Sequence, residues 1–428
     1  MEKFFRLSER NTNVRTEIIA GITTFMTMAY IIFVNPDILS STGMDKMALA
    51  TATILAAAIT TILMGLVTNY PFALASGMGL NAYFAFTVAP QYGWQAALGA
   101  VLISGIVFFL LAVLGIIDLL DKAIPTSLKR AVAAGIGLFI AFIGLTNAGI
   151  IVGSPDTTLA LGNISEPGPL LAIIGLLITA LLMARGVKGS ILIGIIVTTI
   201  IGMFTGVANM PSGIGDLVGK PASLAPIFLE LDFIGAIKLG AMVIFSLLFV
   251  DLFDTLGTLM GAAARAGFLD KDGRLPKVRE AMAVDAFGTM FGAVLGTSTV
   301  TTYVESTAGI SEGGRTGLTA VVTGILFLLA LFFTPLVGLV PGEATAPALI
   351  IVGVLMVGAV SDINFNDFTE AFPAFLTIIA MPFAYSIADG IAVGFLAYPL
   401  VKLVAGRAKE VHWFNYILFI VALLHFVL

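Results

Sequence analysis

The stretch STVTTYVESTAG, residues 298–309, decides how this chain folds, because it is rich in hydroxyl groups, carries the carboxylate of Glu305 and lies among long apolar segments. It is too polar to face lipid and too short to span a bilayer as a helix. Inside a membrane, irregular backbone is tolerated only where protein or a water-filled cavity surrounds it. An ionisable residue at that depth is a candidate functional residue. We therefore expect the other segments to hold this stretch within a membrane.

The composition identifies the class of protein. Hydrophobic residues make up 59% of the 428 residues and charged residues only 11%, with a mean hydropathy of +1.07. Soluble proteins carry about 25% charged residues. We therefore predict an all-α polytopic membrane protein in contact with lipid. At roughly 20 residues per crossing the chain holds about 12 to 15 membrane elements, which leaves no room for a large soluble domain.

Several functional classes are disfavoured by what the sequence lacks. It has no cysteine, which excludes disulfides, thiolate catalysis and cysteine-ligated zinc. The two histidines, His412 and His425, lie in the last apolar segment, so we expect no metal centre and no cofactor. The net charge of −5 and the lack of a basic patch argue against a nucleic-acid partner.

Lysine and arginine gather in alternate loops, with the largest group at 265–279. By the positive-inside rule these loops are cytoplasmic, and the alternation agrees with fourteen crossings. Residues 1–16 are expected to form an uncleaved cytoplasmic leader. For the C-terminal segment, 406–428, an additional span and an interfacial helix both remain possible, and Trp413 and Tyr416 suit the second.

Two short matches at one shared offset indicate an internal repeat. IIFVN at 31–35 resembles LLFVD at 247–251, and Pro125 has a counterpart in Pro341, both at an offset of 216 residues. Transporters are often built from such halves inserted in opposite orientations. We predict 7+7 inverted repeats, the first at 17–207 and the second at 232–405, joined by a linker at 208–231.

The polar stretch should have a counterpart in the first repeat, and ALASGMGLNAYF at 73–84 fits that role. Its closely spaced glycines predict a strand-like entry into a short helix. Paired interrupted segments mark a binding site near the bilayer midplane. Gly79 and Asn81 are therefore candidate ligand contacts, although both residue types are also ordinary in breaks and turns.

A third polar group lies in FVDLFDTLGTLMG at 249–261. On a helix Asp251, Asp254 and Thr258 would share one face. Carboxylates within a span are costly unless they face water or a partner. The structural alternatives are a polar contact between helices for the aspartates and a helix cap for Glu305.

Together these groups suit a small, flat, neutral ligand with hydrogen-bonding groups. Carboxylates accept N–H groups, exposed backbone offers donors and acceptors, and Tyr83 or Phe84 can stack on a ring. Asp251, Asp254 and Glu305 are also candidates to take up a coupling proton. Sodium is less favoured, although hydroxyls and carbonyls at 297–302, including Thr302, are suitable ligands.

Four long motifs resemble the AzgA-like purine permeases, a branch of the nucleobase–ascorbate transporter superfamily. They are GITTFMTMAYIIFVNP (21–36), ALASGMGLNAYFAF (73–86), FVDLFDTLGTLMG (249–261) and STVTTYVESTAGISEGGRTGLTA (298–320). The resemblance covers nearly the whole chain. It implies fourteen elements in 7+7 inverted repeats, core and gate domains that move against each other like an elevator, a homodimer and a bacterial plasma membrane location.

The resemblance also implies roles for individual residues. The acidic residues of the family's eighth and tenth elements match Asp254 and Glu305, and the glycine and asparagine of its third element match Gly79 and Asn81. An aromatic residue of the third element stacks on the base in related members, a role for Phe84 or Tyr83. One departure is Ser76, which stands where the family pattern leads us to expect proline, and we expect it to make the backbone there less rigid.

The sequence thus predicts a transporter and not an enzyme, importing purine nucleobases with protons, hypoxanthine and guanine in preference to adenine. Asp254, Glu305, Asn81, Gly79, Phe84 and Thr302 would bind the base. One alternative is an adenine-preferring permease, and another is an anion exchanger of the same fold, which would need a basic group at the site. A hydrolase using Asp251 and Asp254 is disfavoured because they lie one turn apart on a single helix. The preferred base and the proton stoichiometry stay open.

Overall fold

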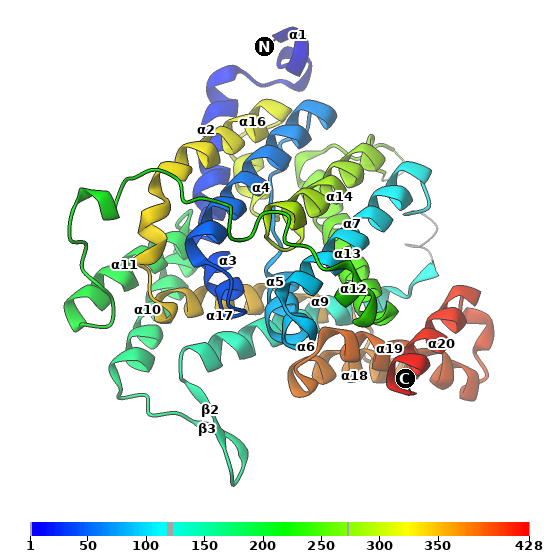
Figure 1. Ribbon diagram of the computed structural model, residues 1–428. Helices are drawn as coiled ribbons and strands as arrows, with labels where there is room; N and C mark the ends of the chain where they lie inside the picture. The colour runs from blue at the N-terminus through cyan, green and yellow to red at the C-terminus, as the bar shows by residue number, and fades with distance from the viewer. Residues whose placement is uncertain (1, 118–122, 272–273, 428) are drawn as a thin grey trace.

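The structure, a computed structural model, describes residues 2–117, 123–271 and 274–427. The first residue of the predicted leader and the last residue of the predicted C-terminal segment lie outside the described residues. Within these ranges the protein is almost entirely helical, with two small two-stranded sheets. Nine helices of the described part are long and apolar enough to cross a membrane, judged by length and composition. The predicted all-α polytopic architecture is confirmed (Figure 1).

The same order of elements occurs twice along the chain. The first half contains α2 (Val14–Met28), α3 (Ile31–Ser40), α4 (Lys46–Thr68), β1 (Leu74–Ser76), α5 (Met78–Tyr83), η2 (Phe84–Val88), α6 (Ala89–Tyr92), α7 (Trp94–Leu114), α9 (Thr126–Asn147), α10 (Pro167–Ala184) and α11 (Ser190–Thr205). The second contains α12 (Phe233–Lys238), α13 (Ala241–Ala266), α14 (Val278–Leu295), β4 (Val300–Thr302), α15 (Ser306–Ser311), α16 (Gly317–Ala330), η4 (Leu331–Gly338), α17 (Gly342–Val357), η5 (Gly358–Asp362), α18 (Phe368–Ala384) and α19 (Ile387–Val404). In each half a strand and a short helix form the third element, and α9 and α17 begin at the offset of 216 residues noted above.

The two interrupted elements meet through their strands. β1 and β4 pair antiparallel, with Ala75 opposite Thr301. The N–H of Gly77 donates to the carbonyl of Thr299 (3.1 Å), and the N–H of Tyr303 donates to the carbonyl of Ala73 (2.9 Å). This pairing satisfies backbone groups that lipid could not satisfy. It confirms that the 73–84 and 298–309 stretches are counterparts.

Ser76 is held in this sheet by side-chain hydrogen bonds. Because Gly77 donates along the ladder, alternation turns the N–H of Ser76 away from β4, so a proline would break no ladder bond there. The serine hydroxyl instead lies 3.2 Å from the hydroxyl of Thr297 and accepts from Asn35 Nδ2 at 3.3 Å. Its carbonyl accepts from the Tyr303 hydroxyl at 2.5 Å. Hydrogen bonds thus supply part of the restraint that a proline ring would give.

Glycines let the helices pack closely in two groups. A Cβ at Gly317 of α16 would lie 1.9 Å from the carbonyl oxygen of Gly65 in α4, and a Cβ at Gly353 of α17 would lie 2.5 Å from that of Gly137 in α9. Small residues at such crossings are typical of membrane helices. The helices α2, α4 and α16 lie side by side in Figure 1, whereas α9 packs against α17 and α18.

The C-terminal helix α20 (Trp413–Val427) runs antiparallel to α19. Near its start the Asn415 amide donates to the carbonyl of Ala123, at the cytoplasmic end of α9 (2.8 Å). Near its end His425 lies 2.7 Å from Asp389, in the first turn of α19 on the external side. At about 1.5 Å per residue, this 15-residue helix is about 22 Å long. It is shorter than the nine described helices that are long enough to cross a membrane, so the structure does not decide between an additional crossing and an interfacial helix.

Candidate substrate-binding site

Asp254 and Glu305 come together where α13 passes the second interrupted element. Glu305 lies at the N-terminus of α15, three residues after the end of β4 and two after Tyr303. Both residues are partly exposed, although most of their neighbours are buried. They are close enough for their charges to repel each other. The structure thus brings together the two residues predicted to clamp the ligand.

The first membrane helix positions Glu305. The hydroxyl of Tyr30 donates to Glu305 Oε1 at 2.7 Å. Tyr30 is 1% exposed and lies at the break between α2 and α3. The sequence analysis missed this residue, although it lies within the 21–36 motif. The hydrogen bond fixes one carboxylate oxygen of Glu305 and leaves the other for a ligand.

Asn81 has a buried side chain whose polar atoms are not hydrogen-bonded within the described part of the protein. The residue lies in α5 and its side chain is fully buried. Neither its amide nitrogen nor its amide oxygen has a hydrogen-bond partner among the described residues. Each unsatisfied buried group costs about 1–3 kcal/mol. A ligand that both donates and accepts would remove that cost.

Gly79 and Phe84 flank Asn81 in different ways. A Cβ at Gly79 would lie 2.5 Å from Ile136 Cγ2, so glycine is needed for α5 to pass α9. Phe84 is fully buried and begins η2, a short π-helix. π-Helical turns are uncommon and often occur at functional sites. Gly79 therefore has a packing role, which the sequence pattern alone did not distinguish from ligand contact.

Two further aspartates lie behind strand β4. Asp251 is 1% exposed, and its Oδ2 accepts from the Thr289 hydroxyl at 2.7 Å. Asp285 of α14 is fully buried, and its Oδ1 accepts from the Thr302 hydroxyl at 2.8 Å. The Thr302 side chain is therefore directed to Asp285. The other oxygen of each aspartate has no hydrogen-bond partner in the described part of the chain.

The sequence analysis missed Asp285. The available signal was its spacing from Thr289, which places both on one face of an otherwise largely apolar helix. Asp251 and Asp254 also differ more than the shared-face prediction implied, because the first is buried against α14 and the second is partly exposed.

Two glycines of α13 follow Asp254 towards the helix end that the positive-inside rule makes cytoplasmic. Gly257 and Gly261 follow Asp254 by one and two turns and are exposed. A Cβ at either glycine would meet no described atom within 4 Å. By the direction that the positive-inside rule gives α13, this strip leads to the cytoplasm.

Comparisons with known proteins identify the family. The family model Xan_ur_permease, described as "Permease family", matches residues 15–393. A putative permease of Methanocaldococcus jannaschii is 54% identical, covering 100% of this chain and 98% of that protein. The guanine/hypoxanthine permease PbuG of Bacillus subtilis is 47% identical (100% and 99% covered), and the adenine permease AdeP of Escherichia coli is 45% identical (96% and 92%).

Among solved structures, the transmembrane domain of the cyanobacterial bicarbonate transporter BicA has a TM-score of 0.66 at 14% identity, covering 89% of this chain and 97% of that one. At this identity the likeness shows the fold alone. The sequence relatives confirm the resemblance to AzgA-like permeases, a multi-pass transporter and not an enzyme. The chain therefore belongs to the permease family that the Xan_ur_permease model describes.

Proposed function

We propose that this protein imports purine nucleobases together with protons, with hypoxanthine and guanine preferred. The relatives named as guanine/hypoxanthine and adenine permeases support the substrate class. The observation that carries the proposal is the unpartnered side-chain amide of Asn81. The same fold brings the carboxyl groups of Asp254 and Glu305 close to each other. These groups match a small ring with N–H donors and a carbonyl acceptor.

An oxopurine satisfies these groups in a complementary way. Its ring N–H groups donate to the carboxylates of Asp254 and Glu305, and its carbonyl oxygen accepts from the Asn81 amide nitrogen. Phe84, in the same element as Asn81, supplies apolar contact to the ring. A base of the wrong pattern would leave a buried group unpaired, at a cost of about 1–3 kcal/mol.

Adenine is the second candidate substrate. AdeP is 45% identical to this chain and PbuG 47%, so overall identity does not separate the two preferences. The Asn81 amide can present its oxygen to an exocyclic amino group as readily as its nitrogen to a carbonyl. Competition between bases decides between the two.

An anion exchanger fits less well. The likeness to a bicarbonate transporter concerns the fold alone. The proposed site contains the two carboxylates of Asp254 and Glu305. These would repel a bicarbonate ion.

For coupling, we propose that a proton neutralises the acidic groups Asp254, Glu305 and Asp251 before the site changes sides. Sodium is the less favoured coupling ion, because Thr297 and Thr302 use their hydroxyls in hydrogen bonds to Asn35 and Asp285. We further propose that the α2–α7 and α13–α16 elements form a core that moves against the gate helices α9–α11 and α17–α19, within a homodimer.

The test is uptake of radiolabelled hypoxanthine in cells that lack their own purine carriers. Unlabelled guanine, adenine, xanthine and uracil serve as competitors, in acidic and in neutral medium. Faster uptake in acidic medium, blocked by guanine and not by adenine, supports the proposal. Block by adenine alone reassigns the substrate, and uptake of no base refutes the proposed function.

A further inference from the structure

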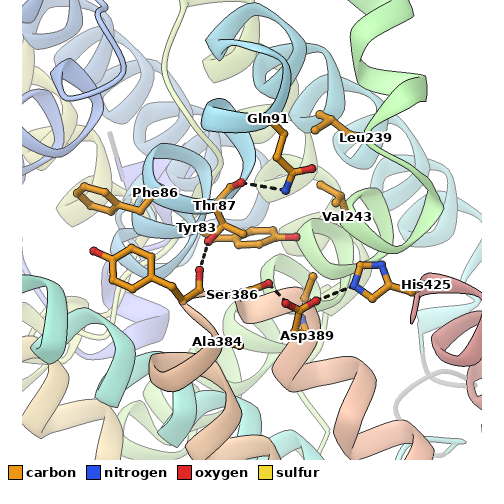
Figure 2. A pocket seen from close by; sticks show the side chains of 12 residues that line it. Tyr83, Phe86, Thr87, Gln91, Leu239, Val243, Ala384, Ser386, Asp389 and His425 are labelled. Carbon is orange, nitrogen blue, oxygen red and sulfur yellow. Dashed lines mark hydrogen bonds and ion pairs between the residues drawn. The ribbon is translucent and has the colours of Figure 1, made fainter. Parts of the chain in front are cut away.

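A cavity that neither Asp254 nor Glu305 lines is present on the side of the molecule that the positive-inside rule makes external. Its volume is about 290 Å³. One wall comes from α5, η2 and α6, and the opposite wall from the turn between α18 and α19 and from the end of α20 (Figure 2). The cavity therefore lies between an interrupted element of the proposed core and two helices of the proposed gate.

The walls combine aromatic rings with hydrogen-bonding groups. The rings of Phe86 and Tyr385 meet edge to face, with centroids 6.4 Å apart. Gln91 Nε2 donates to the carbonyl of Thr87 at 3.0 Å, which leaves its amide oxygen for a ligand. Figure 2 shows the Tyr83 ring across the middle of this group. Such walls suit a flat heteroaromatic ring with polar edges.

Tyr83 adds an unsatisfied donor at the inner end. The residue is fully buried, and its hydroxyl forms no hydrogen bond of good geometry within the described residues, although Ser246 lies nearby. Tyr83 follows Asn81 by two residues and precedes Phe84 in the same interrupted element. The inner wall of the cavity is thus continuous with the proposed substrate site.

The charges at the rim favour a neutral ligand. Asp389 Oδ1 lies 2.7 Å from His425 Nε2, so the one acidic and the one basic side chain of this lining are joined to each other. No unpaired cationic side chain is present among the described lining residues to attract an anion. The volume lies near the lower end of the range of about 300–1,000 Å³ typical of drug-sized ligands, so a single base is a suitable size.

We propose that this cavity is a second, external binding site for the nucleobase, occupied before the base reaches Asp254 and Glu305. The inference rests on the proposed function and adds an entry site to it. The hydrogen bond from the Thr87 hydroxyl to the carbonyl of Tyr385 (2.9 Å) spans the cavity walls, and it joins the proposed core and gate there. Movement of the proposed core relative to the proposed gate would therefore change the shape of this cavity.

Equilibrium binding tests the site directly. Radiolabelled hypoxanthine is dialysed against the purified full-length protein in which Asp254→Ala and Glu305→Ala remove the clamp. We expect weak binding to remain and to fall when Gln91→Ala or Tyr385→Leu is added. Tyr92→Leu is the matched control, since Tyr92 is 51% exposed and outside the cavity lining. Loss of all binding with the clamp, or residual binding indifferent to Gln91 and Tyr385, overturns the proposal.

Transport kinetics give an independent readout in the protein with an intact clamp. Gln91→Ala should raise the half-saturating external concentration of hypoxanthine about two- to tenfold, the size expected for one lost hydrogen bond. The half-saturating internal concentration for efflux should not change, because this cavity faces outward. Equal changes in both directions overturn the external site. Uptake of no base by the wild-type protein would instead refute the proposed function itself.

Discussion

The hydroxyl of Tyr30 and the carboxylate of Glu305, 275 residues apart in the chain, are joined by a 2.7 Å hydrogen bond. The bond connects the break in the first membrane helix with the interrupted element of the second repeat. Any movement of one relative to the other changes the position of a carboxylate that we propose to bind the base. In the proposed mechanism Glu305 would therefore both bind the base and link the two halves of the chain.

Removing either partner should affect transport to different extents. Glu305→Ala should abolish uptake while the protein remains in the membrane, because the ligand loses a carboxylate partner. Tyr30→Phe keeps the ring and removes the hydroxyl, so half-saturation should rise about two- to tenfold. Uptake kinetics with membrane abundance measured in parallel test both. Normal uptake by Glu305→Ala would remove this residue from the site.

Asp254 and Asp251 should differ in sensitivity. Asp254 is partly exposed, whereas Asp251 is buried and hydrogen-bonded to Thr289. We expect Asp254→Ala to abolish uptake and Asp251→Asn, which keeps an oxygen to accept from Thr289, to reduce it less. Initial uptake rates at a saturating base concentration provide the measurement. The reverse order of severity would mean that the clamp has been assigned to the wrong aspartate.

Gly79 should act through packing against α9. Gly79→Ala brings a methyl group to 2.5 Å from Ile136 Cγ2 and should lower uptake. Ile136→Ala removes that atom, so the double variant should recover activity relative to Gly79→Ala. Gly358→Ala, where a Cβ meets no described atom within 4 Å, is the control. Failure of Ile136→Ala to restore uptake would favour direct ligand contact at Gly79.

Glu17 should be essential for stability. Its fully buried carboxylate accepts from the Thr319 hydroxyl (2.6 Å) and from the backbone N–H groups of Arg315 (2.9 Å) and Thr319 (3.1 Å) at the start of α16. Glu17→Ala leaves these buried donors unsatisfied, at about 1–3 kcal/mol each. The melting temperature in detergent should fall well below that of Glu9→Ala, whose side chain is exposed. Equal melting temperatures would contradict this role.

The cytoplasmic ion-pair cluster around Arg407 should not contribute to pH-dependent uptake. A hydrogen bond from Thr369, followed by Arg407, lowers the pKa of Asp367 to about 2, and hydrogen bonds from Arg407 and Lys402 lower the pKa of Glu410 to about 2. Depressed pKa values of carboxyl groups add stability above their unfolded values of about 3.9 and 4.3, and this stability is lost only as pH falls towards 2.

The destabilisation caused by Arg407→Ala should therefore be the same at about pH 5.5 and pH 7.5. Melting temperatures of the variant and the wild-type protein at both values provide the test. A difference that shrinks at the acidic pH would show that this cluster titrates in the range where uptake is measured.

Most of the fold could be predicted from the sequence, because its helices and interrupted elements follow from local residue patterns. Closely spaced glycines predicted the strand-like break at 73–84, and the polar run at 298–309 predicted its counterpart, which the β1–β4 pairing confirms. The repeat was detectable because Pro125 and Pro341 are separated by the same 216 residues as the IIFVN and LLFVD segments. The sequence singled out Gly79 as a candidate site residue. The structure explains the glycine by its close contact with Ile136, which belongs to another helix.

The residues that the sequence analysis missed depend on contacts between distant segments. Nothing next to Tyr30 indicates that it meets Glu305, and Asp285 follows a charged helix start that resembles an ordinary cytoplasmic turn. The external cavity is assembled from four segments, near 83–91, 239–243, 384–389 and 425, and only the first of them overlaps a motif. Tertiary packing, and not local pattern, decides these positions.

The most direct test of the central claim is uptake of radiolabelled hypoxanthine by proteoliposomes that contain only this protein, under an imposed pH gradient with the acidic side outside. Glu305→Ala liposomes serve as the matched control. We predict accumulation above the external concentration that unlabelled guanine prevents and that is lost when the gradient is collapsed. Accumulation of no purine base under the gradient, in liposomes shown to contain folded protein, would contradict the account.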